Sequence, residues 1–142
     1  MNAKGGDQTR LTKNSLEDRN PVWSPDARKV AFTSNRNGNF EIYLMNANGG
    51  ERKRLTKTRA DESSPTWSPD GTEIAFHSDR SGKFEVYVMK ANGKGQRRLT
   101  HSPSGEQAGF PAWSPNGNRI AFTSVRGQHL DISVMSDDGT RL

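Results

Sequence analysis

Apolar residues occur in short clusters that return at a nearly constant interval along the chain. In one kind of cluster, isoleucine or valine and phenylalanine flank an alanine, at residues 30–32, 74–76 and 120–122. This alternation has the two-residue period of a β-strand, and helical spacing is absent. A second kind is rich in β-branched and aromatic residues, at residues 41–45, 85–89 and 131–135. The pattern predicts an all-β fold.

The clusters belong to three copies of one sequence repeat. Residues 20–56 and 64–100 are about half identical without a gap, and residues 110–142 form a third copy. Residues 1–12 match residues 45–56, the last part of the first copy. The sequence therefore predicts a repeat array over residues 1–142, in which residues 1–12 add one outer strand.

Each copy predicts a four-stranded antiparallel meander. The strands are expected around the tryptophan, at the A-F-(T/H)-S segment, at E-I-Y-L-M or its equivalent, and at R-L-T, with Ser-Pro-Asp and Asn-Gly turns between them. Such a sheet has two apolar faces to cover, so copies stack face to face as the blades of a β-propeller. We expect the three tryptophans to pack between blades.

The signature P-x-W-S-P-D-G-x-x-I-A-F-x-S, followed by E-I-Y-x-M and R-L-T, resembles the WD-like repeat of TolB-type β-propellers. The resemblance spans nearly the entire chain and implies three blades, which is half of a six-bladed propeller. It also implies a periplasmic or other extracytoplasmic location and a propeller that binds protein partners. Because the same repeat resembles the propellers of prolyl-oligopeptidase-type peptidases, it indicates the fold and not the function.

The strand count suggests how the blades are completed. One outer strand is expected at residues 6–12, four strands in each of the first two copies, and three in the last. Three blades are too few to close a ring, whereas two chains would provide six. We expect a head-to-tail homodimer in which residues 6–12 of one chain pair with residues 131–135 of the other. The alternative is that the chain is a piece of a longer propeller.

Composition and charge narrow the classes of partner. Only 30% of residues are hydrophobic and the mean hydropathy is -0.96, yet the regular clusters favour a folded chain over a disordered one. The 21 basic residues, which give a net charge of +5, are spread through every copy among 16 acidic residues. This mixture argues against a nucleic-acid partner. No signal peptide or membrane-spanning apolar run is present, so no membrane insertion is expected.

Motifs for catalysis and for metal or cofactor binding are absent from the sequence. It contains no cysteine, no G-x-S-x-G nucleophile elbow and no phosphate-binding glycine motif, and its Asp-Gly and Asn-Gly loops fit turns better than calcium sites. His77, His101 and His129 lack the spacing of a zinc site. His77 replaces a threonine of the other copies, which indicates a structural substitution. We therefore expect no enzyme, metal or cofactor.

A charged loop face is the candidate binding site. The strand order places the connectors that precede each first strand on the same face as the turns between second and third strands. The charged residues expected there are Glu17, Asp18, Arg36, Asp61, Glu62, Arg80, Glu106, Arg126 and His129. With carboxylates near the axis and arginines outside, this face would take a basic peptide end, a cation or a polar ligand. The alternative is local pairing, and the recurrence of the arginines points first to blade stabilisation.

Two classes of function follow from these observations. The preferred hypothesis is a non-enzymatic protein-interaction or self-assembly scaffold whose partner is a second copy, with another protein or peptide as a further partner. The alternative is a small-molecule or metal-binding propeller, or the non-catalytic propeller of a peptidase-like enzyme. An exposed apolar patch on a loop face would favour the first, and a ligand in the channel the second.

Overall fold

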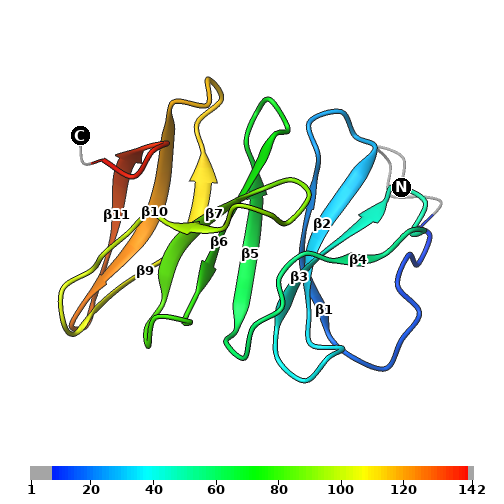
Figure 1. Ribbon diagram of the computed structural model, residues 1–142, viewed down its shortest axis with the longest axis horizontal. Helices are drawn as coiled ribbons and strands as arrows, with labels where there is room; N and C mark the ends of the chain where they lie inside the picture. Colours follow the sequence, from blue (N-terminus) through cyan, green and yellow to red (C-terminus); the bar gives the residue numbers. More distant parts are fainter. Residues whose placement is uncertain (1–7, 141–142) are drawn as a thin grey trace.

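The computed structural model describes residues 8–140, which form three antiparallel β-sheets side by side (Figure 1). Blade 1 contains β1 (Asp18–Trp23), β2 (Lys29–Ser34), β3 (Glu41–Asn46) and β4 (Lys53–Arg54). Blade 2 contains β5 (Glu62–Trp67), β6 (Glu73–Ser78), β7 (Glu85–Lys90) and β8 (Arg97–Arg98). Blade 3 contains β9 (Glu106–Trp113), β10 (Arg119–Arg126) and β11 (His129–Ser136).

This arrangement confirms the predicted all-β propeller architecture with three blades. Consecutive strands pair as neighbours in every blade, so each blade is a meander. Blades 1 and 2 have the four expected strands, whereas blade 3 has three within residues 8–140. Residues 8–12 lie outside any strand, and residues 1–7 and 141–142 fall outside the described part of the chain. Completion of a blade by the N-terminal segment of another chain therefore remains a prediction.

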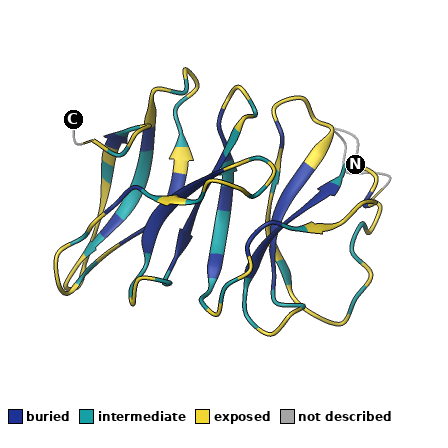
Figure 2. Cartoon of the chain, viewed as in Figure 1, coloured by how far each residue is buried: buried dark blue, intermediate teal, exposed yellow. Residues whose placement is uncertain are grey.

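The middle strands of blades 1 and 2 are buried on both faces (Figure 2). Successive side chains of a strand point to opposite faces, and each face of blade 2 is covered by a neighbouring blade. Ile74 and Phe76 therefore pack toward blade 1, whereas Ala75 packs toward blade 3. Double burial explains why these strands are continuous apolar runs with small residues between large ones.

Two hydrophobic cores lie between the blades. The core between blades 1 and 2 joins Ile42, Leu44 and Leu55 to Trp67 and other residues of blade 2. The core between blades 2 and 3 is built in the same way, with Trp113 partly buried at its edge. Trp67 and Trp113 thus confirm the predicted packing between blades. Trp23 differs because no blade covers that side of blade 1 within residues 8–140, and 55% of its surface is exposed.

Each first strand contains a bulge that the sequence pattern did not reveal. Asn20, Ser64 and Phe110 have φ values of 50°, 51° and 52°, and the pairing register shifts at each of them. A proline follows each of these residues. Because residues within a bulge do not pair with the neighbouring strand, the missing N–H of proline breaks no hydrogen bond of the sheet. The bulge turns the edge strand at the same place in every blade.

The Ser-Pro-Asp turns form as predicted. In blade 2 the Ser68 hydroxyl donates to Asp70 at 2.6 Å and accepts from the Glu73 amide at 3.0 Å. Gly71 has a φ of +73°, which suits glycine, but Ala27 at the same place in blade 1 has a φ of +56°. The turn geometry is therefore fixed by its serine and acidic residue even where glycine is missing.

Candidate functional site

The predicted loop face is present, and its connectors contact one another. The Glu17 amide donates to the Asn35 side chain at 3.0 Å, and the Asp61 amide donates to Asp79 at 2.9 Å. These bonds join the connector before a first strand to the turn between second and third strands, as the strand order predicted. At the opposite end of blade 1, the Ala47 amide donates to the Arg28 carbonyl at 2.9 Å.

On this face each blade has one ion pair that joins its first strand to the end of its second strand or to the turn that follows it. Arg36 lies 2.9 Å from Asp18, Arg80 lies 2.9 Å from Glu62, and Arg126 lies 3.4 Å from Glu106. Six of the nine candidate residues are therefore engaged within their own blade. This is the local pairing that sequence analysis held as an alternative to a ligand site.

The arginines of blades 1 and 2 also stack on aromatic rings. The guanidinium of Arg36 lies 4.6 Å from the centre of the Tyr43 ring, and that of Arg80 lies 4.7 Å from the Tyr87 ring. A cation over an aromatic face is attracted by the ring quadrupole. Stacking and ion pairing together hold these arginines against the blade, which supports the blade-stabilising role that their recurrence suggested.

The other three candidate residues are placed separately. Glu17 pairs with Arg19 at the exposed surface. Asp61 accepts a hydrogen bond from the Phe40 amide at 2.8 Å and so ties the connector to blade 1. His129 starts β11 and is exposed opposite Arg126. Within residues 8–140 no group of three or more histidine or acidic side chains is arranged to hold a metal ion.

Sequence analysis missed two buried carboxylates, Glu41 and Glu85, which hold the connectors between blades. Both are fully buried at the start of a third strand. Glu41 accepts from the Thr58 amide at 2.8 Å, and Glu85 accepts from the Ser102 amide at 2.8 Å. The sequence did contain a signal for this role, because an acidic residue occupies the same position in all three copies, with Asp131 in blade 3.

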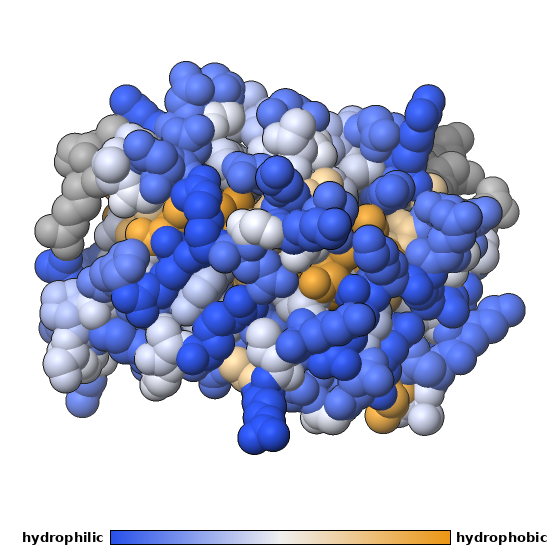
Figure 3. Space-filling model, in the orientation of Figure 1, coloured by the Kyte–Doolittle hydropathy of each residue, from blue (hydrophilic) through white to orange (hydrophobic). Residues whose placement is uncertain are grey.

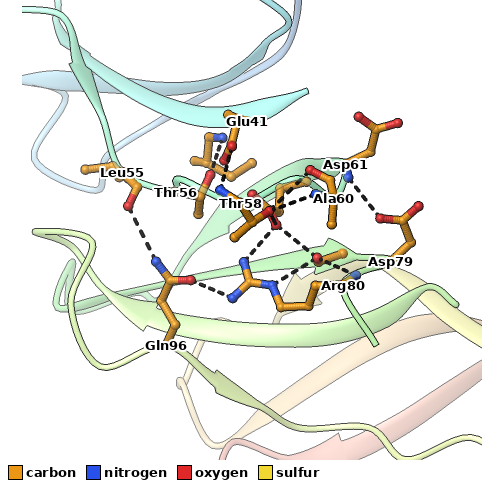
Figure 4. A network of polar contacts seen from close by, with 12 residues as sticks. Glu41, Leu55, Thr56, Thr58, Ala60, Asp61, Asp79, Arg80 and Gln96 are labelled. Atoms are coloured by element: carbon orange, nitrogen blue, oxygen red, sulfur yellow. Dashed lines mark hydrogen bonds and ion pairs between the residues drawn. The ribbon is translucent and has the colours of Figure 1, made fainter. Parts of the chain in front are cut away.

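Glu41 and Glu62 form a buried carboxyl pair between blades 1 and 2. Figure 4 shows Glu41, Thr58 and Arg80 in the polar network around this pair. Burial and the neighbouring Glu41 raise the pKa of Glu62 to about 7. Burial also acts on Glu41, but hydrogen bonds, led by the one with Glu62, outweigh it and lower the pKa of that group. One oxygen of each carboxyl group has no other partner, so a single proton shared between them satisfies both.

His77 is a structural residue in the interface between blades 2 and 3, as predicted. Its Nδ1 accepts from the Phe110 amide at 3.1 Å, and its ring makes edge contacts with the rings of Phe84 and Phe110. Burial lowers the pKa of His77 to about 4. The imidazole is therefore neutral near pH 7 and serves as an acceptor.

The apolar surface that sequence analysis sought on a loop face lies instead on the last sheet. Leu130, Ile132 and Val134, which we call the free face of blade 3, are 71%, 76% and 44% exposed. The residues equivalent to Ile132 and Val134 in blade 2, Val86 and Val88, are fully buried. Elsewhere hydrophilic side chains dominate the view in Figure 3, and apolar atoms show in recesses between them.

No helix within residues 8–140 has the length and apolar character needed to cross a membrane.

No curated protein matches the chain in sequence. Among solved structures, a TolB from Agrobacterium tumefaciens is similar with a TM-score of 0.82 and 28% identity, over 92% of this chain and 49% of that chain. TolB from Acinetobacter baumannii gives a TM-score of 0.71 and 31% identity, over 92% of this chain and 32% of that chain.

More distant similarities show the fold alone. A puromycin hydrolase gives a TM-score of 0.75 at 15% identity, over 91% of this chain and 22% of that chain. This chain therefore spans half or less of the length of these proteins. The family model of the TolB beta propeller domain matches residues 1–142. With three stacked blades that share one repeat, the chain belongs to the TolB beta propeller domain family.

Proposed function

We propose that the chain is a non-enzymatic assembly scaffold in which the blades of two copies stack head to tail into one ring. The observation that carries the proposal is that the chain holds both halves of one blade interface at its two ends. Within residues 8–140 no blade covers the free face of blade 3, and residues 8–12 lie against blade 1 in the position of a preceding blade's outer strand.

Residues 8–12 contact blade 1 through Leu11, as the outer segments of blades 1 and 2 contact the blades that follow them. A Cβ atom on Gly93 would lie 2.8 Å from the Leu55 carbonyl oxygen, and one on Gly139 would lie 3.0 Å from that of Leu99. On Gly49 it would lie 2.9 Å from the carbonyl oxygen of Leu11. Leu11 also packs against the core cluster of blade 1 that contains Phe32 and Met45.

The third strand of blade 3 offers the groups that would bind such a segment. In blade 1 the Leu55 amide donates to the Ile42 carbonyl at 2.8 Å, and the Ile42 amide donates to the Thr56 hydroxyl at 2.8 Å. Blade 2 repeats both bonds with Leu99, Thr100 and Val86. By the same register, Leu11 and Thr12 of a second copy would bind Ile132, with Asp131 in the place of Glu41.

The comparison with TolB supports two chains per ring. The chain is similar to the Agrobacterium tumefaciens protein over 92% of its own length and 49% of that protein's, with a TM-score of 0.82. Two copies would thus match that chain in length while keeping its spacing between blades. The absence of a G-x-S-x-G motif from residues 1–142 supports a role without catalysis.

Light scattering on a size-exclusion column tests assembly. We expect the mass of two 15.7 kDa chains, and we expect Ile132→Glu to yield single chains because it places a charge in the contact. Gln128→Glu, at the exposed turn between β10 and β11, is the matched control and should leave the mass unchanged. A wild-type chain that stays at 15.7 kDa at every concentration would refute the proposal.

Cysteine cross-linking tests the strand pairing itself. The register of β3 with β4, in which Leu44 pairs with Lys53, places Thr9 of one copy opposite Val134 of the other. The chain contains no cysteine, so Thr9→Cys combined with Val134→Cys has a clean background. We expect a disulfide-linked dimer under oxidation and none with either single variant. A dimer that forms without this cross-link, and that survives deletion of residues 1–12, would show that assembly uses other contacts.

A further inference from the structure

One position of the repeat changes from tyrosine to serine in blade 3. The third residue of the third strand is Tyr43 in blade 1, Tyr87 in blade 2 and Ser133 in blade 3. In blade 1 the Tyr43 ring stacks on Phe32 with centroids 5.8 Å apart, and in blade 2 Tyr87 stacks on its partner phenylalanine at 5.9 Å. The guanidinium of Arg36 lies 4.6 Å from the centre of the Tyr43 ring and 5.4 Å from that of Phe32, so the arginine contacts both rings, and blade 2 repeats this arrangement.

Blade 3 keeps both partners of the missing ring. Phe122 is equivalent to Phe32 and Phe76, and Arg126 to the stacked arginines. Phe122 is only partly buried, whereas Phe32 and Phe76 are almost fully buried. The side chain of Arg126 is 56% exposed, against 21% for Arg36 and Arg80. Loss of the tyrosine therefore leaves part of the Phe122 ring uncovered and removes one of the two rings that hold the arginine in blades 1 and 2.

An open groove of about 620 Å³ lies at this position. Its wall includes Phe122, Ser133 and Arg126, and it extends along Leu99 to Gly139. Its polar groups include the hydroxyls of Ser124 and Ser133, which lie 2.8 Å apart, and the carboxylate of Glu106. The groove thus combines an aromatic face, a cation and hydrogen-bond acceptors, and it has room beyond one ring for a substituent.

We propose that this groove is a binding site for para-substituted phenols, which take the place that a tyrosine ring has in blades 1 and 2. The ring stacks on Phe122 and contacts the guanidinium of Arg126, as the Tyr87 ring contacts both Phe76 and Arg80 in blade 2. The hydroxyl donates to an acceptor at the polar side of the groove, and the para substituent lies along the wall formed by Leu99.

Titration with p-cresol, followed by ¹H–¹⁵N NMR, tests the site directly. We expect saturable shifts at Phe122, Ser133 and Arg126 and small shifts at the equivalent positions of blade 2, where a tyrosine ring occupies the space. Toluene, which lacks the hydroxyl, should bind roughly threefold or more weakly. N-acetyltyrosinamide distinguishes a tyrosine side chain from a small free phenol, and binding of either ligand supports the site.

Variants at Ser133 test whether p-cresol binds in the groove itself or affects the protein elsewhere. Ser133→Tyr supplies the ring from the chain itself, and we expect it to weaken p-cresol binding about tenfold or more while raising the unfolding midpoint. Ser133→Ala keeps the space and should bind p-cresol within about threefold of the wild type. Absence of saturable shifts at the groove, equal binding of toluene, or undiminished binding to a folded Ser133→Tyr variant would each refute the proposal.

Discussion

The interface between blades 1 and 2 and the interface between blades 2 and 3 have the same backbone plan but different polar contents. The first buries the Glu41–Glu62 pair, which contacts the half-buried side chains of Arg54 and Arg80. The second buries His77 against two phenylalanine rings. The blades therefore stack in the same way at both interfaces, whereas the buried polar groups and their protonation differ from one interface to the other.

The histidine is accommodated by a matching change across the interface. Between blades 1 and 2, Thr33 faces Ser63, with their hydroxyls 3.5 Å apart. Between blades 2 and 3, His77 takes the place of the threonine and Gly109 lies in the facing bulge. A Cβ on Gly109 would lie 3.3 Å from Nδ1 of His77, so a larger residue would crowd the ring. At Ser133, by contrast, no neighbour compensates for the lost tyrosine, and a groove results.

The largest expected effect on stability comes from replacing the equivalent core phenylalanine by alanine in each of the two interfaces. Phe76→Ala removes a fully buried ring between blades 1 and 2, and we expect a loss of about 3–5 kcal/mol in the free energy of unfolding. Phe122→Ala removes a partly buried ring beside the groove and should cost about 1–2 kcal/mol. Urea unfolding of both variants measures the difference. Equal costs would show that the groove beside Phe122 is closed in solution.

Sequence analysis predicted what depends on a residue and its near neighbours in the chain. The strand period, the Ser-Pro-Asp turns and the stacking of Trp67 between blades all follow from one repeat. It could not predict that Glu41 is buried beside Glu62, because that contact joins two copies across an interface. The groove at Ser133 was also missed, since a substitution within a repeat does not show whether a neighbouring side chain fills the space.

The next effect concerns acidic pH and the interface between blades 2 and 3. The pKa of His77 is lowered to about 4, so the unfolded chain binds the proton more readily than the folded chain. Its stabilising contribution is complete above pH 6.5 and is lost as the pH falls toward 4, by on the order of 2–3 kcal/mol. Urea unfolding between pH 4 and pH 7 measures this loss.

The double variant His77→Thr/Gly109→Ser recreates the pair found between blades 1 and 2. It removes the imidazole and should remove the loss between pH 6.5 and pH 4, while its stability at pH 7 remains close to that of the wild type. If the double variant still loses the same stability over this range, then another group in the chain titrates and His77 is not the source.

The smallest effect has the opposite sign with pH and arises between blades 1 and 2. Because the pKa of Glu62 is raised to about 7, the folded chain keeps a proton that the unfolded chain releases near pH 4.5. The favourable contribution of the protonated pair is complete below pH 4.5 and is lost as the pH rises through 7. We expect a loss on the order of 1–2 kcal/mol between pH 5 and pH 8.

Glu62→Gln keeps a hydrogen-bond donor toward Glu41 but cannot titrate, so its stability should be flat over this range. Glu106→Gln, the same change in blade 3 at a side chain that is 29% exposed, is the matched control and should keep the slope of the wild type. Unfolding in urea from pH 5 to pH 8 checks both. A wild-type slope retained in Glu62→Gln would mean that the carboxyl pair does not hold its proton near neutrality. The interface between blades 1 and 2 would then have no pH response to oppose that of the interface between blades 2 and 3.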